Sequence, residues 1–309
     1  MLYKHLPIIP FYHTVSDSYL PHVHHLFRYR GVSEFESDLR LFSRKFEFLS
    51  LSQFLESRES ASRPKAGLLL TFDDGLRQCY DIIYPILKRH GIPAVFFVTT
   101  DFLDNQSLFY RHKASLLAEH IHSTTSAKQL AAISEKLNLQ RSTCENEISL
   151  KVLQLSFDQQ KLIDEIALMC EIDFAAFLHQ HRPYLDTAQL VELEAHGFDI
   201  GAHSLSHQWL NEMNPDIQLE QIRGSTELLT SLIEQPSRSF AFPFNCDGVS
   251  PTTFEKVLGE NIVDIMFGAG GIGTWDEPDY YRRFSMEGTT KSARRILSQQ
   301  YRSLMFPEQ

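Results

Sequence analysis

The stretch Gly67-Leu-Leu-Leu-Thr-Phe-Asp-Asp-Gly75 combines a run of apolar residues with two adjacent carboxylates and a turn glycine. The continuous apolar character predicts a strand that is covered on both faces, as in a parallel sheet flanked by helices. Neighbouring strand side chains point to opposite sides, so one of Asp73 and Asp74 can hold a cation while the other accepts a proton. There is an alternative, because Asp-Gly is common turn chemistry and Asp74 could cap a following helix.

A second segment, His203-Ser-Leu-Ser-His207, holds the one pair of histidines, among 14, that are four residues apart. On a helix this spacing places both imidazoles on one face, where they can bind one ion. Asp74 is the natural third ligand. Two imidazoles and one carboxylate leave an open position, as in catalytic Zn²⁺ sites, and other divalent ions fit as well. The alternative is a pair of surface histidines on a helix.

Together these segments resemble the motifs of the NodB-like polysaccharide deacetylases, which form carbohydrate esterase family 4. Thr71-Phe-Asp-Asp-Gly75 is similar to the first motif, and the histidine segment is similar to the second, His-Ser/Thr-x-x-His. The resemblance implies an α/β fold, a distorted (β/α)7 barrel, and it covers most of the chain outside residues 103–185. It also implies that Asp73 is the general base and that the metal ligands are Asp74, His203 and His207.

The third motif of this family, usually Arg-x-Pro-Tyr/Phe-Gly, is similar to Ala241-Phe-Pro-Phe-Asn245. By resemblance, the backbone N–H of Phe244 helps to hold the oxyanion that develops on the acetyl carbonyl. Ala241 stands where the family has the arginine that orients the base. Arg283 is the candidate replacement, although Arg282 and Arg283 could also be an exposed pair at a strand edge.

The general acid of the family usually comes from a Leu-x-His near the C-terminus, and no histidine follows His207 here. An apolar strand predicted over residues 6–12 delivers His13 at its end instead. This arrangement resembles the permuted branch that includes the poly-N-acetylglucosamine deacetylases, where a Tyr-His on the first strand supplies the acid. An acid is required because a sugar amide leaves poorly unless its nitrogen is protonated. The alternative is a histidine that is hydrogen-bonded within the core.

Composition agrees with an enzyme that acts on a neutral or weakly charged glycan. The chain has 309 residues, 43% of them hydrophobic, and a formal net charge of −10, which argues against nucleic acid as a partner. The four scattered cysteines are expected to be free thiols. No apolar run of about 18 residues predicts a membrane span. No signal peptide is visible, so we expect a cytoplasmic protein, or an exported one that has been trimmed. The oligomeric state stays open.

The periodicity predicts one barrel over residues 1–309, with residues 103–185 as a helical insertion. Four aromatic residues could stack on sugar rings or simply fill the core: Tyr110, Tyr184, Trp209 and Trp275. Helices are predicted over residues 33–46, 76–90, 216–233 and 290–303, and strands near residues 94–99, 198–203, 239–244, 262–267 and 281–286.

The resemblance implies metal-dependent hydrolysis of N-acetyl groups on N-acetylglucosamine-type glycans, with release of acetate. A second hypothesis is a carbohydrate-binding member that keeps the metal and has lost catalysis, suggested by Ala241 and by the displaced acid. A third is hydrolysis of a non-sugar amide, as in related metal-free barrels. The third is disfavoured because a full set of metal ligands would be superfluous there.

Overall fold

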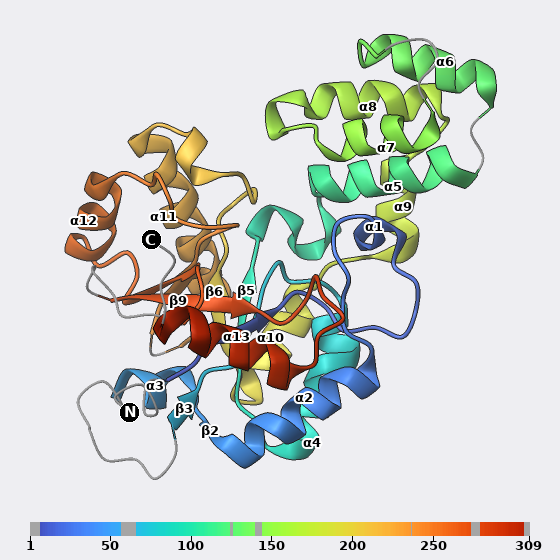
Figure 1. Cartoon of the computed structure of the whole chain (residues 1–309). Helices are drawn as coiled ribbons and strands as arrows, with labels where there is room; N and C mark the ends of the chain where they lie inside the picture. Colours follow the sequence, from blue (N-terminus) through green and yellow to red (C-terminus); the bar gives the residue numbers. More distant parts are fainter. Residues whose placement is uncertain are drawn as a thin grey trace. The chain divides into compact units, whose positions relative to one another are not determined.

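A computed structural model describes residues 7–56, 66–123, 126–139, 144–235, 237–272 and 279–305. The chain forms two compact units (Figure 1). Unit 1 comprises Met1–Asp17, Tyr29–Asp104 and Tyr184–Gln309, and unit 2 comprises Ser18–Arg28 and Asn105–Pro183. The predicted insertion at residues 103–185 encloses the longer segment of unit 2. That Ser18–Arg28 also belongs to unit 2 was not indicated by any sequence pattern.

Unit 1 is built on a closed barrel of seven strands in the order β1-β4-β5-β6-β7-β8-β9. Every neighbouring pair is parallel, and β9 closes the ring by pairing with β1. This architecture confirms the (β/α)7 barrel. The strands are β1 (Pro10–Tyr12), β4 (Thr71–Phe72), β5 (Val95–Val98), β6 (Asp199–Ala202), β7 (Ser239–Ala241), β8 (Ile265–Ala269) and β9 (Tyr280–Ser285).

Successive side chains of β5 point alternately into two different core clusters, which shows why the barrel strands are apolar on both faces. Val95 and Phe97 belong to a core cluster that also contains residues of β7 and β8. Phe96 and Val98 belong to a larger cluster formed with the surrounding helices. Successive strand side chains point to opposite faces, so one set fills the barrel and the other set packs under the helices. All four side chains are at most 1% exposed, which is what a doubly covered strand requires.

Helices surround the barrel of unit 1. The bounds of the four predicted helices agree with the structure to within three residues, and three further helices were not predicted. The predicted helix at 76–90 is a π-helical turn, η2 (Cys79–Ile83), followed by α4 (Tyr84–His90). The other helices are α2 (Val32–Lys45), α3 (Leu51–Glu56), α10 (Thr187–Ala195), α11 (Pro215–Leu232), α12 (Pro251–Gly259) and α13 (Ala293–Met305), with short 3₁₀ turns η3 (Thr100–Asn105) and η5 (Leu210–Glu212).

The strand predicted near residue 67 is shared between two sheets. Its first part, β3 (Ala66–Leu68), pairs with β2 (Phe46–Phe48) in a separate two-stranded parallel sheet. Its second part is β4 of the barrel. The prediction that the helix at 33–46 includes Phe46 was therefore wrong at its last residue, because Phe46 pairs with Ala66 in this small sheet.

Unit 2 is helical throughout the parts that the structure describes, as predicted for residues 103–185. Its elements are α1 (Pro21–His24), α5 (Tyr110–Ser123), α6 (Ala127–Lys136), α7 (Glu145–Leu153), η4 (Phe157–Gln159), α8 (Gln160–Met169) and α9 (Phe174–His181). None of the described helices in either unit is both long enough and apolar enough to cross a membrane.

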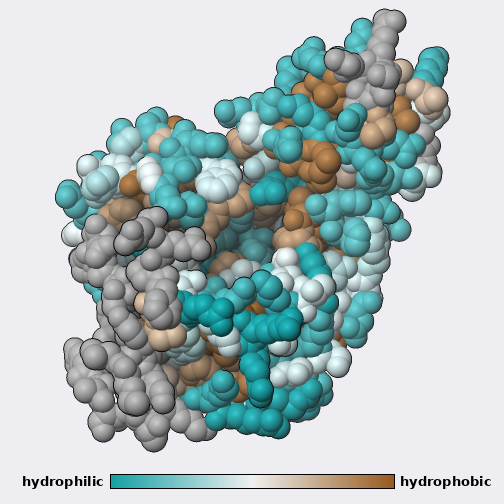
Figure 2. All heavy atoms as spheres, in the orientation of Figure 1, coloured by the Kyte–Doolittle hydropathy of each residue, from teal (hydrophilic) through white to brown (hydrophobic). Residues whose placement is uncertain are grey.

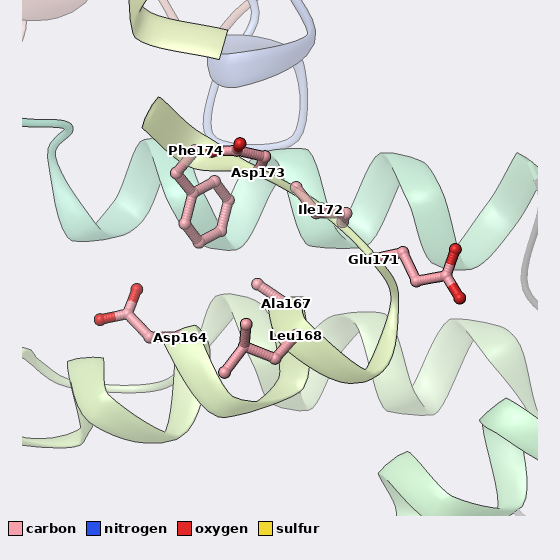
Figure 3. A pocket seen from close by; sticks show the side chains of 7 residues that line it. All are labelled: Asp164, Ala167, Leu168, Glu171, Ile172, Asp173 and Phe174. Atoms are coloured by element: carbon pink, nitrogen blue, oxygen red, sulfur yellow. The ribbon is translucent and has the colours of Figure 1, made fainter. Parts of the chain in front are cut away.

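The surface of unit 2 carries exposed apolar side chains and one open pocket. Leu150 and Leu168 are 58% and 77% exposed, and Figure 2 shows apolar patches among the polar residues of these helices. A pocket of about 440 Å³ lies between α8 and the start of α9. In Figure 3 the Phe174 ring points toward α8, whereas the Glu171 side chain points away. Its lining residues are Asp164, Ala167, Leu168, Glu171, Ile172, Asp173 and Phe174. None of these is a predicted site residue.

Candidate active site

The predicted site residues of unit 1 follow the carboxyl ends of barrel strands. His13 comes directly after β1, Asp73 and Asp74 come after β4, and His203 comes after β6. Phe244 lies three residues beyond β7. Because all seven strands are parallel, their carboxyl ends meet at one mouth of the barrel, where active sites of such barrels form. The topology therefore gathers His13 and Phe244, which are 231 residues apart in the chain (244 − 13), at one mouth.

Asp74, His203 and His207 converge at this mouth. Asp74 Oδ1 lies 3.4 Å from His203 Nε2 and 3.0 Å from His207 Nε2, and all three residues are buried. Their candidate ligand atoms lie within 4.8 Å of one another. Among the residues that the structure describes, no other group of three or more His, Cys, Asp or Glu side chains converges in this way. The alternative of two surface histidines is wrong.

The path by which the histidines converge differs from the prediction. Residues 203–209 form a loop after β6 and are not helical. Ser204 and His207 have positive φ angles of 66° and 54°, so two left-handed residues turn the chain back on itself. The Ser204 hydroxyl accepts a hydrogen bond from the His207 N–H at 2.9 Å and supports this turn. The spacing was read as one helical turn, but a tight loop brings the rings together instead.

The donor chemistry of this group fits a divalent cation. His203 Nδ1 lies 2.7 Å from the Ala241 carbonyl oxygen, which can only accept, so Nδ1 carries the proton and the Nε2 lone pair faces Asp74. Burial lowers the pKa of His207, which favours its neutral form. Asp74 Oδ1 is buried and has no hydrogen-bond donor in the described part of the chain. Acceptor atoms that face one another in this way are stabilised by a cation between them.

Asp73 is held by a buried arginine. Arg283 donates from Nη1 and Nη2 to the two carboxylate oxygens of Asp73, at 2.6 and 2.8 Å, and Nη1 also lies 3.2 Å from the Thr71 hydroxyl. The guanidinium lies over the rings of Phe11 and Phe97, with its carbon 4.9 and 5.1 Å from the ring centroids. This bidentate geometry orients the carboxylate as well as neutralising its charge.

The same contact fixes the charge state of Asp73. Burial raises the pKa of Asp73, but Arg283, together with His203 and His13, outweighs burial and lowers the pKa below its usual value. Arg283 is 1% exposed, so the alternative of an exposed strand-edge arginine is wrong for this residue. The structure brings Arg283 from β9 to the aspartate, whereas the buried Ala241 on β7 carries no such cation.

His13 is paired with Glu287, a residue that the sequence analysis did not identify. His13 Nδ1 lies 2.6 Å from Glu287 Oε2. The backbone N–H groups of His13 and Thr14 donate to the two oxygens of the same carboxylate, at 2.8 and 3.1 Å. The His13 side chain is 23% exposed and that of Glu287 is 1% exposed, so the imidazole keeps access to solvent above a buried carboxylate.

The carboxylates around His13 favour its protonated form. Burial lowers the pKa of His13, but Asp74 and Glu287 outweigh it and raise the pKa to about 9. The sequence position of Glu287 could have marked it as a site residue. A carboxylate two residues beyond β9 must lie at the same mouth as the other strand ends. Its partner, however, is 274 residues away, and no local pattern links the two.

Comparison with known families decides what kind of barrel this is. A profile described as Polysaccharide deacetylase matches residues 60–247, more than half of the chain. The chain belongs to the polysaccharide deacetylase family. The matched segment contains the aspartate pair, the histidine pair and Phe244. It does not contain His13, Arg283 or Glu287, which the barrel brings to the mouth from the two ends of the chain.

Curated relatives match this chain over a short region. A poly-β-1,6-N-acetyl-D-glucosamine N-deacetylase of Staphylococcus aureus (strain N315) is 39% identical over 69 residues, which is 22% of this chain and 24% of the relative. The enzyme of the same name from Staphylococcus epidermidis is 31% identical over 87 residues, which is 28% of this chain and 29% of the relative. The matched region thus spans about a quarter of the curated relatives' length.

Solved structures resemble this protein over nearly its whole chain. The Streptococcus pyogenes deacetylase PplD in complex with acetate has a TM-score of 0.61 at 15% identity, covering 95% of this chain and 97% of the other. IcaB from Ammonifex degensii has a TM-score of 0.58 at 16% identity, with 95% and 98% covered. At such low identity these similarities support the fold.

The segment similar to the third family motif ends in a strained turn. Phe244 has a φ angle of 59°, which is unusual for a bulky residue. Its ring stacks on Trp209, with centroids 4.2 Å apart. Of the other aromatic residues that were considered for sugar stacking, Tyr110 and Tyr184 are buried at 6% and 1% exposure. Trp275 lies outside the described residues.

Proposed function

We propose that this polysaccharide deacetylase hydrolyses the N-acetyl group of N-acetylglucosamine units in a glycan and releases acetate. The observation that carries the proposal is a pair of adjacent carboxylates at the barrel mouth whose side chains have different partners. Asp73 is paired with an arginine, and Asp74 faces two imidazoles. The similarity to the two staphylococcal relatives supports the substrate class, since both are poly-β-1,6-N-acetyl-D-glucosamine N-deacetylases.

The residues that would hold a divalent ion, with Zn²⁺ as the first candidate, are Asp74, His203 and His207. When bound there, such an ion supplies Lewis acidity, which lowers the pKa of water and polarises an acetyl carbonyl. The ligand set agrees with this use because it contains three protein donors, as catalytic zinc sites do.

Two residues of the protein carry out the two proton transfers of the reaction, one as base and one as acid. Asp73, kept ionised by Arg283, accepts a proton from the water that attacks the acetamide carbonyl. The Phe244 N–H donates to the oxygen of that carbonyl as negative charge develops on it. His13, kept protonated beside Glu287, donates its proton to the amide nitrogen as the C–N bond breaks. The products are acetate and a glycan with a free amine.

A binding-only member is less well supported than an enzyme. It was suggested by Ala241 in the arginine position and by the missing C-terminal histidine. In the structure Arg283 contacts the aspartate from another strand, and His13 lies at the carboxyl end of β1 beside a buried glutamate. Neither sequence feature therefore leaves a gap in the set of residues that hydrolysis needs.

The direct test is acetate release by the full chain, loaded with zinc, from oligomers of β-1,6-linked N-acetylglucosamine. Acetate is measured with a coupled assay, and free amines are counted in the same samples. We expect equal amounts of both products from the wild-type protein and none after removal of metal by a chelator. Tight binding of the oligomer by the zinc-loaded protein, with no acetate released, would instead establish the binding-only member.

Glu287→Gln is expected to move the alkaline limit of activity to lower pH and to lower kcat by about 10–100-fold. The general acid acts only while it is protonated, so activity is lost as pH rises through the pKa of His13. Glu287 raises that pKa, and removal of its charge lowers it. The pH profile of kcat for the variant and the wild type measures the displacement.

A matched control for this variant is Glu260→Gln, which removes the charge of an exposed glutamate paired with Arg223. The control should keep the wild-type profile. An alkaline limit that stays in place in Glu287→Gln, in a protein that is folded by circular dichroism, would exclude His13 as the acid that Glu287 supports.

A further inference from the structure

The backbone of Phe244 needs support that its own strand does not provide. β7 ends at Ala241, and Phe244 adopts a φ angle of 59° three residues later. For a residue with a bulky side chain this left-handed conformation is strained. Strain of this kind persists where neighbouring groups hold the residue in place, and it is concentrated at functional sites.

Two rings from the preceding loop hold the Phe244 side chain. The Trp209 indole stacks on it with centroids 4.2 Å apart and planes within 5° of parallel. The His207 imidazole meets the same ring edge-on, with centroids 4.9 Å apart. The loop after β6 thus contacts the loop after β7 through these rings. The two strands are neighbours in the barrel.

Trp209 is itself firmly anchored. It immediately precedes η5 (Leu210–Glu212), in which Leu210 is 1% exposed. The buried Gln218 side chain on α11 donates to the Leu210 and Met213 carbonyl oxygens, at 2.9 and 3.1 Å. Its amide oxygen accepts from the Ser250 N–H at 3.1 Å, at the start of α12. These hydrogen bonds hold the backbone of the turn that directly follows Trp209, and the Phe244 ring stacks on the indole at the start of that turn.

We propose that Trp209 is a positioning residue, which holds the Phe244 ring so that the Phe244 backbone N–H points at the developing oxyanion. This inference rests on the proposed deacetylation. The ring and the N–H belong to one residue, so fixing the ring through Cβ also fixes the peptide plane before it. A misplacement of about 1 Å in such a group can cost about 100-fold in rate.

This role differs from direct stacking of Trp209 on a sugar. One face of the indole is already covered by Phe244, in near-parallel contact. A residue that binds sugar equally in the ground state and the transition state changes KM, whereas one that aims an oxyanion donor changes kcat. The two roles therefore separate in steady-state kinetics.

The test compares Trp209→Ala, Trp209→Phe, Phe244→Ala and the double variant Trp209→Ala/Phe244→Ala. For Trp209→Ala we expect a kcat about 10–100-fold lower, with KM and zinc affinity within about threefold of wild type. Trp209→Phe should recover most of the rate, because a phenyl ring can still stack. The double variant should be no slower than the slower single variant, since both changes break the same contact.

Tyr80→Leu serves as the matched control, because it removes one ring from another stacked pair, Tyr80 and Tyr84, with centroids 5.4 Å apart. It should leave kcat unchanged. Melting temperatures, and zinc affinities measured by competition with a chelator, are determined for every variant. These two measurements show whether loss of a ring has unfolded the protein or disturbed His207.

Three outcomes would overturn the inference alone. A raised KM with unchanged kcat would show that Trp209 binds sugar. A loss of zinc affinity in Trp209→Ala would show that it acts through His207. Additive losses in the double variant would show that Trp209 acts independently of the Phe244 ring. Absence of acetate release by the zinc-loaded wild type is a different result, because it would overturn the proposed function and this inference with it.

Discussion

Asp73→Asn is expected to lower kcat by about 10²–10⁴-fold while the protein still binds a divalent ion. An amide cannot accept the proton of the attacking water, and the candidate ligands are the neighbouring Asp74 and two histidines. Steady-state acetate release measures the loss, and metal analysis of the same preparation measures the bound ion. A variant with wild-type turnover would remove Asp73 from the role of base.

The matched control is Asp74→Asn, the same change at the next residue. It should lose the metal, so the two variants separate proton transfer from metal binding within one dipeptide. Asp73→Asn also leaves the buried Arg283 without its carboxylate, and breaking a buried pair costs about 3–5 kcal/mol of stability. The melting temperature is therefore measured first, and kinetics are recorded below the onset of unfolding.

His203→Ala is expected to abolish both metal binding and turnover. The imidazole is one of three candidate ligands, and its Nδ1–H is fixed by the Ala241 carbonyl, so no neighbouring group can take its place. Zinc affinity should fall by more than about 100-fold, beyond the usual effect of changing a residue that only supports a ligand. Chelator competition measures the affinity, and acetate release measures the turnover.

Thermal unfolding gives an independent reading of the same variant. A ligand at 100 times its Kd stabilises the folded state by about 2.7 kcal/mol, so zinc should raise the melting temperature of the wild type and not that of His203→Ala. His196→Ala is the control, because this histidine contacts Tyr84 on α4 and is not part of the convergent group. An equal zinc effect on wild type and His203→Ala would place the metal elsewhere.

Individual strands and helices of the barrel were predictable because their signals are local, whereas its closure by seven strands was implied by the family resemblance. The apolar run before Asp73 predicted a doubly covered strand, and Leu68, Leu69 and Leu70 are fully buried. The bounds of four helices and of strands β5 to β9 were predicted to within three residues, whereas α3, α10 and α12 were not predicted. These properties depend on residues that lie close together in the chain, so the sequence contains them directly.

Local spacing was a weaker guide where several backbone paths satisfy it. The separation of His203 from His207 indicated a helix, but the chain turns through left-handed residues at Ser204 and His207 instead. The functional expectation, that both imidazoles face one point, agrees with the structure. A four-residue spacing limits the distance between two side chains, and it does not choose the conformation that joins them.

The sequence by itself thus determined the candidate residues and their order along the chain. These are an aspartate pair after one buried strand, a histidine pair after another, and one further arginine and histidine, Arg283 and His13. Which groups pair was decided by closure of the barrel. Arg283 meets Asp73 across 210 residues, and Glu287 meets His13 across 274. Ser18–Arg28 joins a helical unit whose remaining residues begin at Asn105. Contacts of this range depend on the packing of whole strands and helices, and no short segment of sequence encodes them.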